Sequence, residues 1–192
     1  YGKSLAAGVA TMDIMLDLQR NRFFSGNFFQ FSGGTSYATH TSPERDFRSH
    51  PAWLAVQMAN EHAMDPRVHS TALSVPTVFV PGEDEFPDTH APLIDVHAYR
   101  NGLDYTAIVL SRSLDEETLV TLHLPFSESS SSRVHMLTGD PRTNNVQAPV
   151  VGIQSESFVP NFSGSTYTFP MPPGSIYVLS LIHISEPTRQ DR

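Results

Sequence analysis

Beyond Pro66 the sequence breaks into short runs of β-branched and aromatic residues separated by turn signals. Six runs stand out, and they cover residues 73–80, 93–99, 105–112, 118–124, 133–137 and 175–181. The breaks between them include Pro81-Gly82, Gly139-Asp140-Pro141 and Pro172-Pro173-Gly174. Short strands at this spacing, punctuated by Gly and Pro, are typical of an antiparallel sandwich or a small barrel. The sequence therefore predicts a β-sandwich domain over residues 67–181.

One break, Asn101-Gly102, makes a more specific prediction. It separates two alternating runs, residues 93–99 and 105–112. Asn-Gly between such runs favours a type I′ hairpin turn, because both central residues then need a positive φ and Asn and Gly tolerate it best. We therefore expect these two strands to be antiparallel neighbours.

Residues 1–66 have a different character, and they begin with a predicted helix. One apolar stripe recurs at i, i+4, i+7 and i+11, formed by Leu5, Val9, Met12 and Leu16. This period is that of an amphipathic helix. Asp13 and Asp17 fall off the stripe and are interpreted as charges on the solvated face. Asn21 is the expected C-terminal stop.

An aromatic run at residues 23–31 then predicts a buried strand, and a polar loop follows at residues 35–49. A second helix is expected from Pro51 to about Ala63, because Pro suits the first helical turn. Its apolar face is predicted to carry Trp53, Val56, Asn60 and Ala63. Helix, strand, loop and helix in this order are typical of part of a βα repeat.

Composition excludes several classes of function. Hydrophobic residues make up 39% and charged residues 17%, which indicates a globular chain. The formal net charge is −8 and no Lys/Arg run is present, which disfavours nucleic-acid binding. There is no cysteine, so disulfides and zinc-thiolate sites are excluded. No apolar stretch reaches the roughly 18 residues needed to span a bilayer. The chain starts at Tyr1, so we expect the true N-terminus to be missing, and the localisation stays open.

The end of the chain is expected to lie outside the natural fold. Residues 179–189 resemble the translation of a sequencing-library adapter, so residues 182–192 are interpreted as an artefact and His183 receives no role. The alternative is a genuine polar tail. Leu179, Ser180 and Leu181 can nevertheless complete the last strand.

Several motifs then resemble one enzyme family. Val134-His-Met-Leu-Thr-Gly-Asp140, Thr143-Asn-Asn145 and Pro149-Val-Val151 are similar to a stretch of the α-L-arabinofuranosidases of glycoside hydrolase family 51. The ending Met171-Pro-Pro-Gly-Ser-Ile-Tyr-Val178 resembles their final strand, and Ala107-Ile-Val-Leu-Ser-Arg112 a central one that usually ends in Asn-Arg. His50-Pro51 before Leu54-Ala-Val-Gln57 resembles the start of the eighth barrel helix.

This resemblance implies a fold that is mostly β with a short α/β part. Residues 1–66 would be the last elements of a (β/α)8 barrel, and the antiparallel β-sandwich would follow. Without the first six barrel strands, Leu5, Val9, Met12 and Phe28 are expected to expose apolar surface. Residues 1–66 would then be unstable alone, whereas residues 67–181 would fold independently.

The resemblance also implies a chemistry. In the retaining glycoside hydrolases of clan A, which the chain resembles, the catalytic residues are two glutamates at the ends of barrel strands four and seven, and both would lie upstream of Tyr1. We therefore expect no catalytic residue in this chain and no hydrolysis by it. The parent is expected to be a cofactor-free exo-glycosidase acting on carbohydrate, namely the side chains of plant polysaccharides.

Substrate-binding residues are expected near the eighth barrel strand, because the loops after barrel strands build the pocket. The candidates are Gln30, Phe31, Tyr37 and His40. The alternative is that Phe31 belongs to the core and His40 to an exposed loop. Glu44 and Asp46 form a possible carboxylate pair, but two acids in a polar loop are usually solvated.

The histidines and the single tryptophan lead to two further predictions. His97, His123 and His135 follow strand patterns and lack metal-ligand spacing, so no metal site is predicted and local hydrogen bonds are favoured. Trp53, the only tryptophan, is expected to anchor a helix.

The alternative function is a non-catalytic carbohydrate-binding or structural sandwich. Such a binding module needs an exposed aromatic platform, yet the strand aromatics show none: Phe79, Tyr99, Tyr105, Phe158 and Tyr167. A sandwich whose face is buried against the helices would argue against it.

Overall fold

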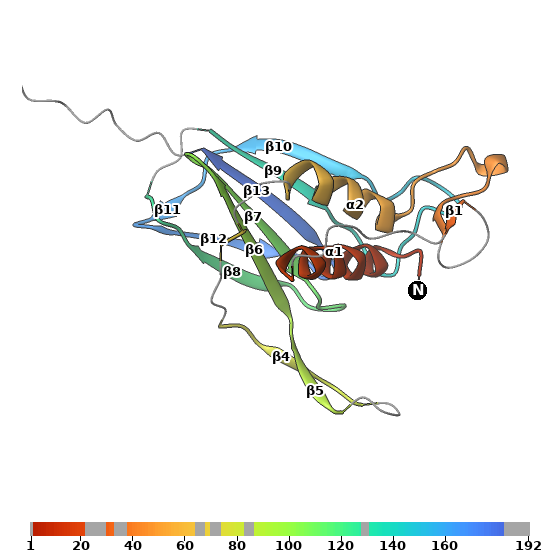
Figure 1. Cartoon of the computed structure of the whole chain (residues 1–192), viewed down its shortest axis with the longest axis horizontal. Helices are drawn as coiled ribbons and strands as arrows, with labels where there is room; N and C mark the ends of the chain where they lie inside the picture. Colours follow the sequence, from red (N-terminus) through yellow and green to blue (C-terminus); the bar gives the residue numbers. More distant parts are fainter. Residues whose placement is uncertain are drawn as a thin grey trace, which may run out of the picture.

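The protein folds into three layers, shown by a computed structural model (Figure 1). The structure describes residues 2–21, 30–32, 38–63, 68–69, 74–82, 87–127 and 131–182. For residues 30–32, 68–69, 131 and 182 it describes the backbone alone. Two helices form the first layer, a six-stranded sheet the second and a three-stranded sheet the third.

The two stacked sheets confirm the predicted antiparallel sandwich. The larger sheet is antiparallel throughout, in the order β10 (Ile153–Phe158), β9 (Ser131–Leu137), β13 (Ile176–Ile182), β7 (Asp104–Ser111), β6 (Ile94–Asn101) and β3 (Val68–His69). The smaller sheet follows the order β11 (Phe162–Ser163), β12 (Thr166–Met171) and β8 (Thr118–His123). The sequence runs had not shown β10, β11 or β12.

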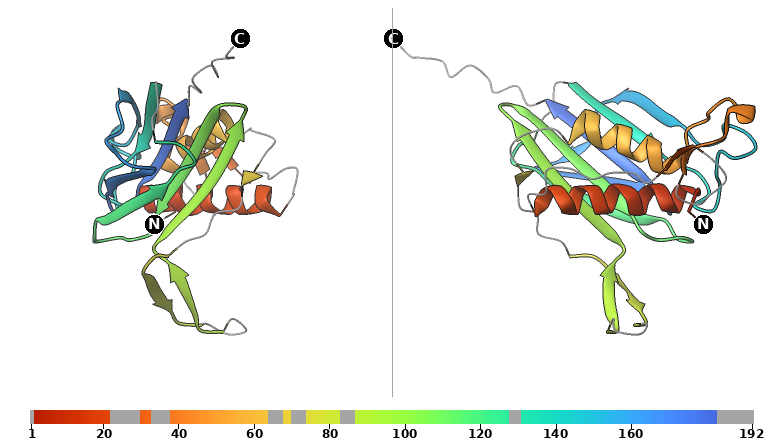
Figure 2. Two further views of the ribbon diagram at one scale, coloured as in Figure 1. Left: turned by 90° about the vertical axis from the view of Figure 1, so that its left-hand side faces the viewer. Right: turned by 45° about the vertical axis from the view of Figure 1, so that its right-hand side comes forward.

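Both predicted helices are present and lie side by side on one face of the larger sheet (Figure 2). α1 (Leu5–Arg20) starts at Ser4, whose hydroxyl accepts the backbone N–H of Ala7, and ends at Asn21 as predicted. α2 (Pro51–His62) starts after His50 and ends at Ala63. The helices approach closely at Gly8, where an added Cβ would lie 2.9 Å from the carbonyl oxygen of Pro51.

The predicted apolar face of α2 is partly wrong. Val56 and Ala63 are buried, but Asn60 is exposed and Trp53 is half-buried. The buried face instead runs through Ala55, Met58 and Ala59. Small residues dominate this face because α1 and the sheet both lie against it, and close packing leaves little room for large side chains.

The larger sheet is buried on both faces. Along β13, Ile176 and Val178 join the core on the helix side, while Tyr177 and Leu179 join the core between the sheets. The same alternation holds in β7, where Ile108 faces the helices and Val109 faces the smaller sheet. Successive side chains of a strand point to opposite faces, so a strand covered on both sides reads as one continuous apolar run.

The helices pack on each other and on this sheet, which corrects the expectation of exposed apolar surface. Leu5, Val9 and Met12 are 0%, 4% and 0% exposed and share one core with Ile108 and Leu137. Phe28 lies outside the described residues. The sandwich therefore covers the apolar stripe of α1, which was expected to be exposed in the absence of the other barrel strands.

The β6–β7 hairpin is confirmed, but its turn type is not the predicted one. Asn101 pairs with Asp104, so Gly102 and Leu103 form the loop. Of the residues at this turn, Gly102 has a positive φ, 62°, whereas Asn101 and Leu103 do not. A positive φ at the first central residue alone is typical of a type II′ turn. The register is thus shifted by one residue from an Asn-Gly turn.

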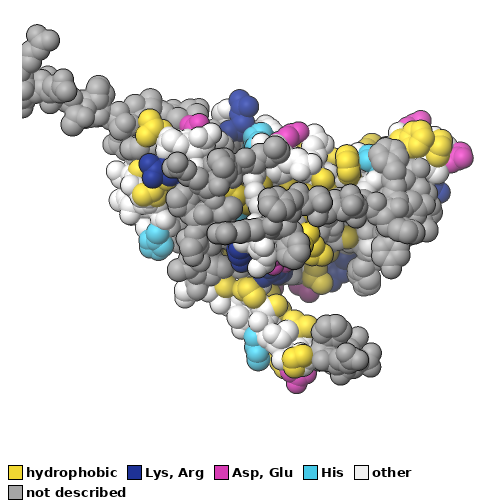
Figure 3. Space-filling view, viewed as in Figure 1, with side chains coloured by type: hydrophobic (Ala, Val, Ile, Leu, Met, Phe, Trp, Pro, Cys, Tyr) yellow, Lys and Arg dark blue, Asp and Glu magenta, His cyan; other side chains and the backbone are white. Residues whose placement is uncertain are grey.

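A two-stranded arm projects from the body (Figures 1 and 2). It consists of β4 (Thr77–Val80) and β5 (Thr89–Pro92), the latter not predicted. The start of the predicted strand at residues 73–80 lies outside the described part. Val78 and Phe79 are 45% and 53% exposed, and hydrophobic side chains are visible along the arm in Figure 3.

The remaining elements precede α2 or end the chain. β1 (Gln30–Ser32) pairs in parallel with β2 (Ala38–His40), and a 3₁₀ turn follows at Pro43–Arg45. The predicted strand at residues 23–31 lies largely outside the described residues. At the other end, the backbone of Ile182 still belongs to β13, although it was expected outside the fold. Residues 183–192 are not described. No helix in the described ranges has the length and apolar character that a membrane crossing requires.

Candidate functional site

Three of the predicted substrate-binding residues, Gln30, Phe31 and His40, belong to the paired strands β1 and β2. Gln30 is opposite Ala38 and Ser32 is opposite His40. Because the strands are parallel, their carboxyl ends meet at one edge, next to the start of α2. The side chains of Gln30 and Phe31 are not described, and Tyr37 lies outside the described residues. His40 is therefore the one candidate whose surroundings are defined.

His40 is buried at the end of β2, which differs from the alternative of an exposed loop residue. It is 7% exposed, and its Nδ1 lies 3.0 Å from the hydroxyl oxygen of Thr39. Its ring packs against Trp53 of α2, with centroids 5.2 Å apart and planes tilted by 53°. Trp53 thus joins α2 to β2, in agreement with its predicted anchoring role.

His50 lies beside this pair and had been considered only as part of a helix-start motif. Its backbone N–H donates to the carbonyl of Thr39 at 2.8 Å, and its side chain is 0% exposed. Within the described structure neither ring nitrogen has a hydrogen-bond partner. Burial, and then the neighbouring basic groups of Lys3 and His40, lower the pKa of His50 to about 4. The imidazole is therefore neutral at physiological pH.

The loop before α2 is hydrogen-bonded to the part of the sandwich whose motifs resemble those of family 51. Asn145 donates to the carbonyls of Ser49 at 2.9 Å and Val151 at 2.7 Å, and accepts the N–H of Val151. The Arg48 guanidinium donates to the carbonyl of Gln147 at 2.7 Å. Thr143-Asn-Asn145 and Pro149-Val-Val151 thus hold the His40 edge in place, a structural rather than chemical role.

A second polar cluster joins α1 to the larger sheet. Arg112, just after β7, donates to both carboxylate oxygens of Asp13 at 2.9 and 2.7 Å. It also donates to Asp95 of β6 at 3.0 Å. Asp13 is therefore no solvated-face charge, because its side chain is 21% exposed and held in a bidentate ion pair. Asp17, with its side chain 50% exposed and 3.4 Å from Arg20, fits the predicted surface position.

The same cluster also brings together three potential ligands for a cation. One ligand atom each of Asp13, Asp95 and His97 lies within 4.8 Å of the others. Arg112 and Arg20 already balance the two carboxylates, and Arg20 also donates to Nδ1 of His97 at 3.3 Å. That contact makes Nδ1 the acceptor, so Nε2 carries the proton and faces Asp95 at 3.4 Å. A cation would have to displace two guanidinium groups, so the arrangement fits a structural ion cluster better.

The carboxylates of the described residues show no acid–base pair at this edge. Although burial alone would raise the pKa of Asp95, its contacts with His97 and Arg112 hold it below its ordinary value. Hydrogen bonds, first from Ser42, lower the pKa of the exposed Glu44. A glycosidase proton donor needs a raised pKa. Asp46 ends the 3₁₀ turn with a φ of 59°. Asp95 and Glu44 are therefore ionised at neutral pH.

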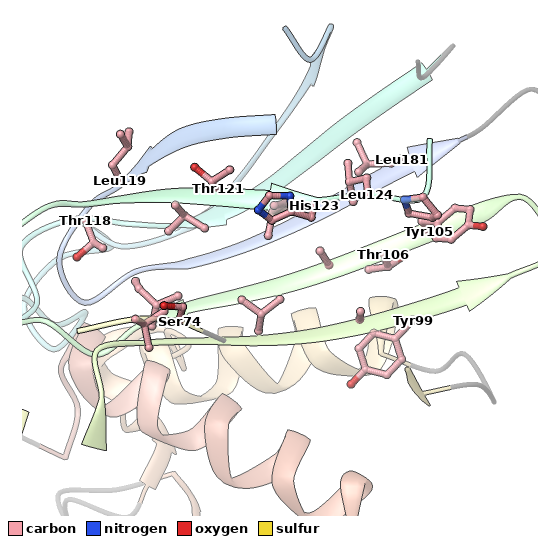
Figure 4. A pocket seen from close by; sticks show the side chains of 18 of the residues that line it. Ser74, Tyr99, Tyr105, Thr106, Thr118, Leu119, Thr121, His123, Leu124 and Leu181 are labelled. Atoms are coloured by element: carbon pink, nitrogen blue, oxygen red, sulfur yellow. The ribbon is translucent and has the colours of Figure 1, made fainter. Parts of the chain in front are cut away.

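The sandwich itself contains a cleft of about 880 Å³ between β8 and the β6–β7 half of the larger sheet (Figure 4). Aliphatic side chains such as Val96, Val120 and Leu122 form much of its wall. Tyr99 is directed away from it, toward the helices, and Tyr105 packs on Phe126 at 5.0 Å. Among the described lining residues there is no aromatic platform for a sugar ring.

The other strand aromatics also differ from a binding platform. Phe158 packs on Tyr167 at 5.6 Å, and both are half-buried, whereas Phe79 is exposed on the arm against His90. The opposite face of the larger sheet is covered by the helices. In the described structure, the features that would favour a carbohydrate-binding sandwich are therefore not found.

Comparison with solved structures identifies the fold. The α-L-arabinofuranosidase of Thermotoga maritima in complex with arabinose has a TM-score of 0.75 and 17% identity, over 94% of this chain and 39% of that chain. The family 51 α-L-arabinofuranosidase of Bifidobacterium longum has a TM-score of 0.69 and 19% identity, over 93% of this chain and 35% of that chain. The fold expected from the sequence motifs is thereby confirmed.

The same fold is not confined to one family. A family 44 xyloglucanase from Paenibacillus polymyxa, solved with xyloglucan, has a TM-score of 0.58 and 13% identity over 96% of this chain and 30% of that chain. No protein-family model and no curated protein matches the chain. The fold is therefore that of a region found in glycoside hydrolases, and this chain spans less than two fifths of the arabinofuranosidase chains it resembles.

Proposed function

We propose that this chain is the C-terminal part of an α-L-arabinofuranosidase-like exo-glycosidase, in which a β-sandwich and two helices support the substrate-binding edge. The observation that carries the proposal is coverage: nearly the whole chain, 94%, superposes on 39% of an arabinofuranosidase. A fold region shared at this extent supports a role as one part of a larger enzyme.

The contacts of the described residues favour a supporting role for the sandwich. The first backbone N–H groups of α1 donate to sandwich carbonyls, Leu5 to Thr143 at 2.8 Å and Ala6 to Pro141 at 2.9 Å. Together with Asn145 and Arg112, these bonds fix both helices on the sheet. The edge that carries His40 is thereby held against the sandwich.

The proposed substrate contacts are Gln30, Phe31, Tyr37 and His40. An imidazole beside an indole, as in His40 and Trp53, offers a hydrogen bond to a sugar hydroxyl next to an apolar surface for its C–H groups. Gln30 and Phe31 share the neighbouring strand in register with β2. The partner is accordingly a carbohydrate, and the reaction needs no cofactor.

The two catalytic glutamates are proposed to belong to the part of the enzyme that this sequence does not include. The described acids support this assignment, because Asp13 and Asp95 are neutralised by Arg112 and Glu44 is exposed with a lowered pKa. Retaining hydrolysis needs one protonated and one ionised carboxyl group about 5 Å apart. Arabinofuranose on plant polysaccharide side chains is the leading substrate class.

An assay of the purified chain with chromogenic arabinofuranosides and xylosides tests the proposal directly. We expect no turnover above the buffer blank. Hydrolysis that is lost on Glu44→Gln would place a catalytic acid in this chain and overturn the assignment. Retention of the chain on insoluble arabinan would instead favour the carbohydrate-binding alternative.

A second test addresses the substrate edge. The gene sequence preceding the codon for Tyr1 should encode a barrel with two glutamates, and an enzyme expressed from it should hydrolyse arabinofuranosides. In that enzyme His40→Ala should raise KM at least about tenfold if one hydrogen bond to the sugar is lost. His123→Ala, on the exposed side of β8, is the matched control and should leave KM unchanged.

A further inference from the structure

Two histidines meet where the end of α2 lies on the larger sheet. The rings of His62 on α2 and His135 on β9 have centroids 4.2 Å apart and planes inclined by 33°. The side chain of His62 is 19% exposed, and its Nε2 is buried without a hydrogen-bond partner in the described structure. His135 is held by Ser155 of β10, with Nδ1 and Oγ 2.7 Å apart. This ring pair is a direct contact between the helix layer and the sheet.

His50 occupies a comparable position at the other end of the same helix. It is the N-cap residue of α2, fully buried, with both ring nitrogens unpaired in the described structure. Lys3, before α1, and His40, on β2, are the basic groups near it. Both ends of α2 are therefore docked through imidazoles that lack an acidic hydrogen-bond partner.

The charged groups around the ring pair decide which form the fold prefers. Burial lowers the pKa of His62 and the neighbouring His135 lowers it further, whereas Glu61 raises it. Burial also lowers the pKa of His135, as does Arg133, against a raising effect of Glu61. The carboxyl end of a helix ordinarily favours a protonated histidine. Here burial and the second imidazole outweigh both the helix end and Glu61, which lies 3.8 Å away and is half exposed.

We propose that α2 is an acid-sensitive element, held on the sheet by neutral His50, His62 and His135 and released locally when these imidazoles become protonated. The released segment would include Trp53, so the packing that holds His40 would loosen with it. The proposal concerns the stability of the fold and does not depend on the proposed enzymatic function.

The direction of the pH effect follows from linkage. The unfolded chain has histidines with a pKa near 6.5, and the folded pKa is lower for all three. The unfolded state therefore binds more protons at acidic pH, and stability falls there. The contribution is fully present above pH 6.5 and is lost as the pH falls toward the folded values, which for His50 is about 4.

The experiment is hydrogen–deuterium exchange of the whole chain between pH 7.5 and 4.5, corrected for the intrinsic exchange rate. We expect the protection factors of α2 amides to fall at least about tenfold below pH 5.5, the effect of one pKa unit on an opening equilibrium. Protection of β7 and β13 should persist. The emission maximum of Trp53, the sole tryptophan, should shift to the red over the same range.

Variants separate this local release from general acid unfolding. His62→Gln combined with His135→Gln replaces the ring pair with side chains that do not titrate, and it should reduce the acid loss of α2 protection to the part that His50 causes. If the double variant does not fold, the single variant His135→Gln is measured in its place. His123→Gln, an exposed histidine on β8, is the matched control and should behave as the parent. Equal acid loss in parent and ring-pair variants, or loss of α2 and β13 protection together, would overturn the proposal.

Discussion

The two faces of the larger sheet are both buried, yet they are held to their neighbours by different chemistry. On the side of the smaller sheet the contacts are apolar and aromatic, with Phe169 stacked between Tyr167 and Tyr177 at 5.2 and 5.9 Å. On the helix side, an apolar stripe is combined with buried or half-buried ionisable groups, Arg112, Asp95 and His97 among them.

This difference reflects what each layer must do. Two sheets that pack face to face need only area and shape, because their backbone groups are already paired within each sheet. A helix laid on a sheet can slide or rotate on an apolar surface, and a directional ion pair removes that freedom. The cost is sensitivity to pH, since a buried charge or neutral imidazole contributes only in one protonation state. From acidic to neutral pH the helix side should therefore respond to pH, whereas the sheet–sheet side, whose tyrosines Tyr167 and Tyr177 have raised pKa values, should not.

The largest loss is expected on the apolar side. Phe169→Ala should lower the free energy of unfolding by about 3–5 kcal/mol, because a 6%-exposed aromatic ring is replaced by a cavity. Urea unfolding at pH 5 and pH 8 checks the value, and the loss should be the same at both. Leu119→Ala, in the same sheet but 72% exposed, is the control and should change little. A loss that differs between the two pH values would contradict the comparison.

The next effect concerns the ion cluster on the helix side. Arg112→Ala should cost about 3 kcal/mol, because Asp13 and Asp95 lose the guanidinium that they share. The folded pKa of Asp95 lies below its ordinary 3.8, so this contribution is present above pH 3.8 and is lost below it. Denaturant titrations from pH 7 to 3 should show that the difference in unfolding free energy between Arg112→Ala and the parent becomes smaller only at the acidic end of this range.

Arg142→Ala is the matched control for this cluster. Its partner Asp115 is 2.9 Å away, but the two side chains are 53% and 74% exposed. An exposed pair of this kind contributes about 0–1 kcal/mol. Similar losses for Arg112→Ala and Arg142→Ala would show that the buried cluster has no special role in holding α1.

A smaller effect is expected where the helices cross. Gly8→Ala would place Cβ 2.9 Å from the carbonyl oxygen of Pro51, a clash that backbone must relieve. Overpacking costs about 1–3 kcal/mol, whereas alanine in a helix gains up to about 1 kcal/mol, so a net loss of about 1 kcal/mol is expected. Thermal unfolding of Gly8→Ala and Gly152→Ala measures it. Gly152 has nothing within 4 Å of an added Cβ, so an equal loss at both positions would exclude the crossing as its cause.

The smallest effect involves one hydroxyl on each face. The Tyr99 hydroxyl donates to Gln19 at 2.8 Å, and Gln19 donates to the carbonyl of Ala63 at 2.6 Å, so the three link β6, α1 and the end of α2. Tyr99→Phe should cost about 1 kcal/mol at pH 7. Tyr177→Phe, on the aromatic side, should cost less.

The pH profile of the two tyrosine variants sharpens the contrast. Burial raises the pKa of Tyr99 to about 12, so its contribution is present below pH 10 and is lost as the pH rises toward 12. Denaturant midpoints from pH 8 to 11 should fall less steeply for Tyr99→Phe than for the parent. An unchanged alkaline slope would mean that this phenol is not a titrating link between the layers.

The candidate site could be predicted only in part. The motif around His50-Pro51 located the start of α2, whereas the strand predicted at residues 23–31 lies largely outside the described residues. The burial of His50 could not be inferred, because nothing in the neighbouring sequence shows which surfaces cover it. The pairing of His62 with His135 joins residues from different layers, and no spacing rule reaches across them.

What the sequence determined by itself was local. The 3.6-residue stripe with Asn21 at its end defined α1, and the continuous apolar runs defined β6, β7 and β13. Gly102 determined that a tight turn joins β6 and β7. Only the tertiary structure decided which residues and surfaces contact one another. Asp13 binds Arg112 at a separation of 99 residues, and the helix stripe is covered by the sandwich. The physical reason is that backbone period and turn geometry act between neighbours, whereas burial and charge compensation depend on which surfaces the folded chain brings together.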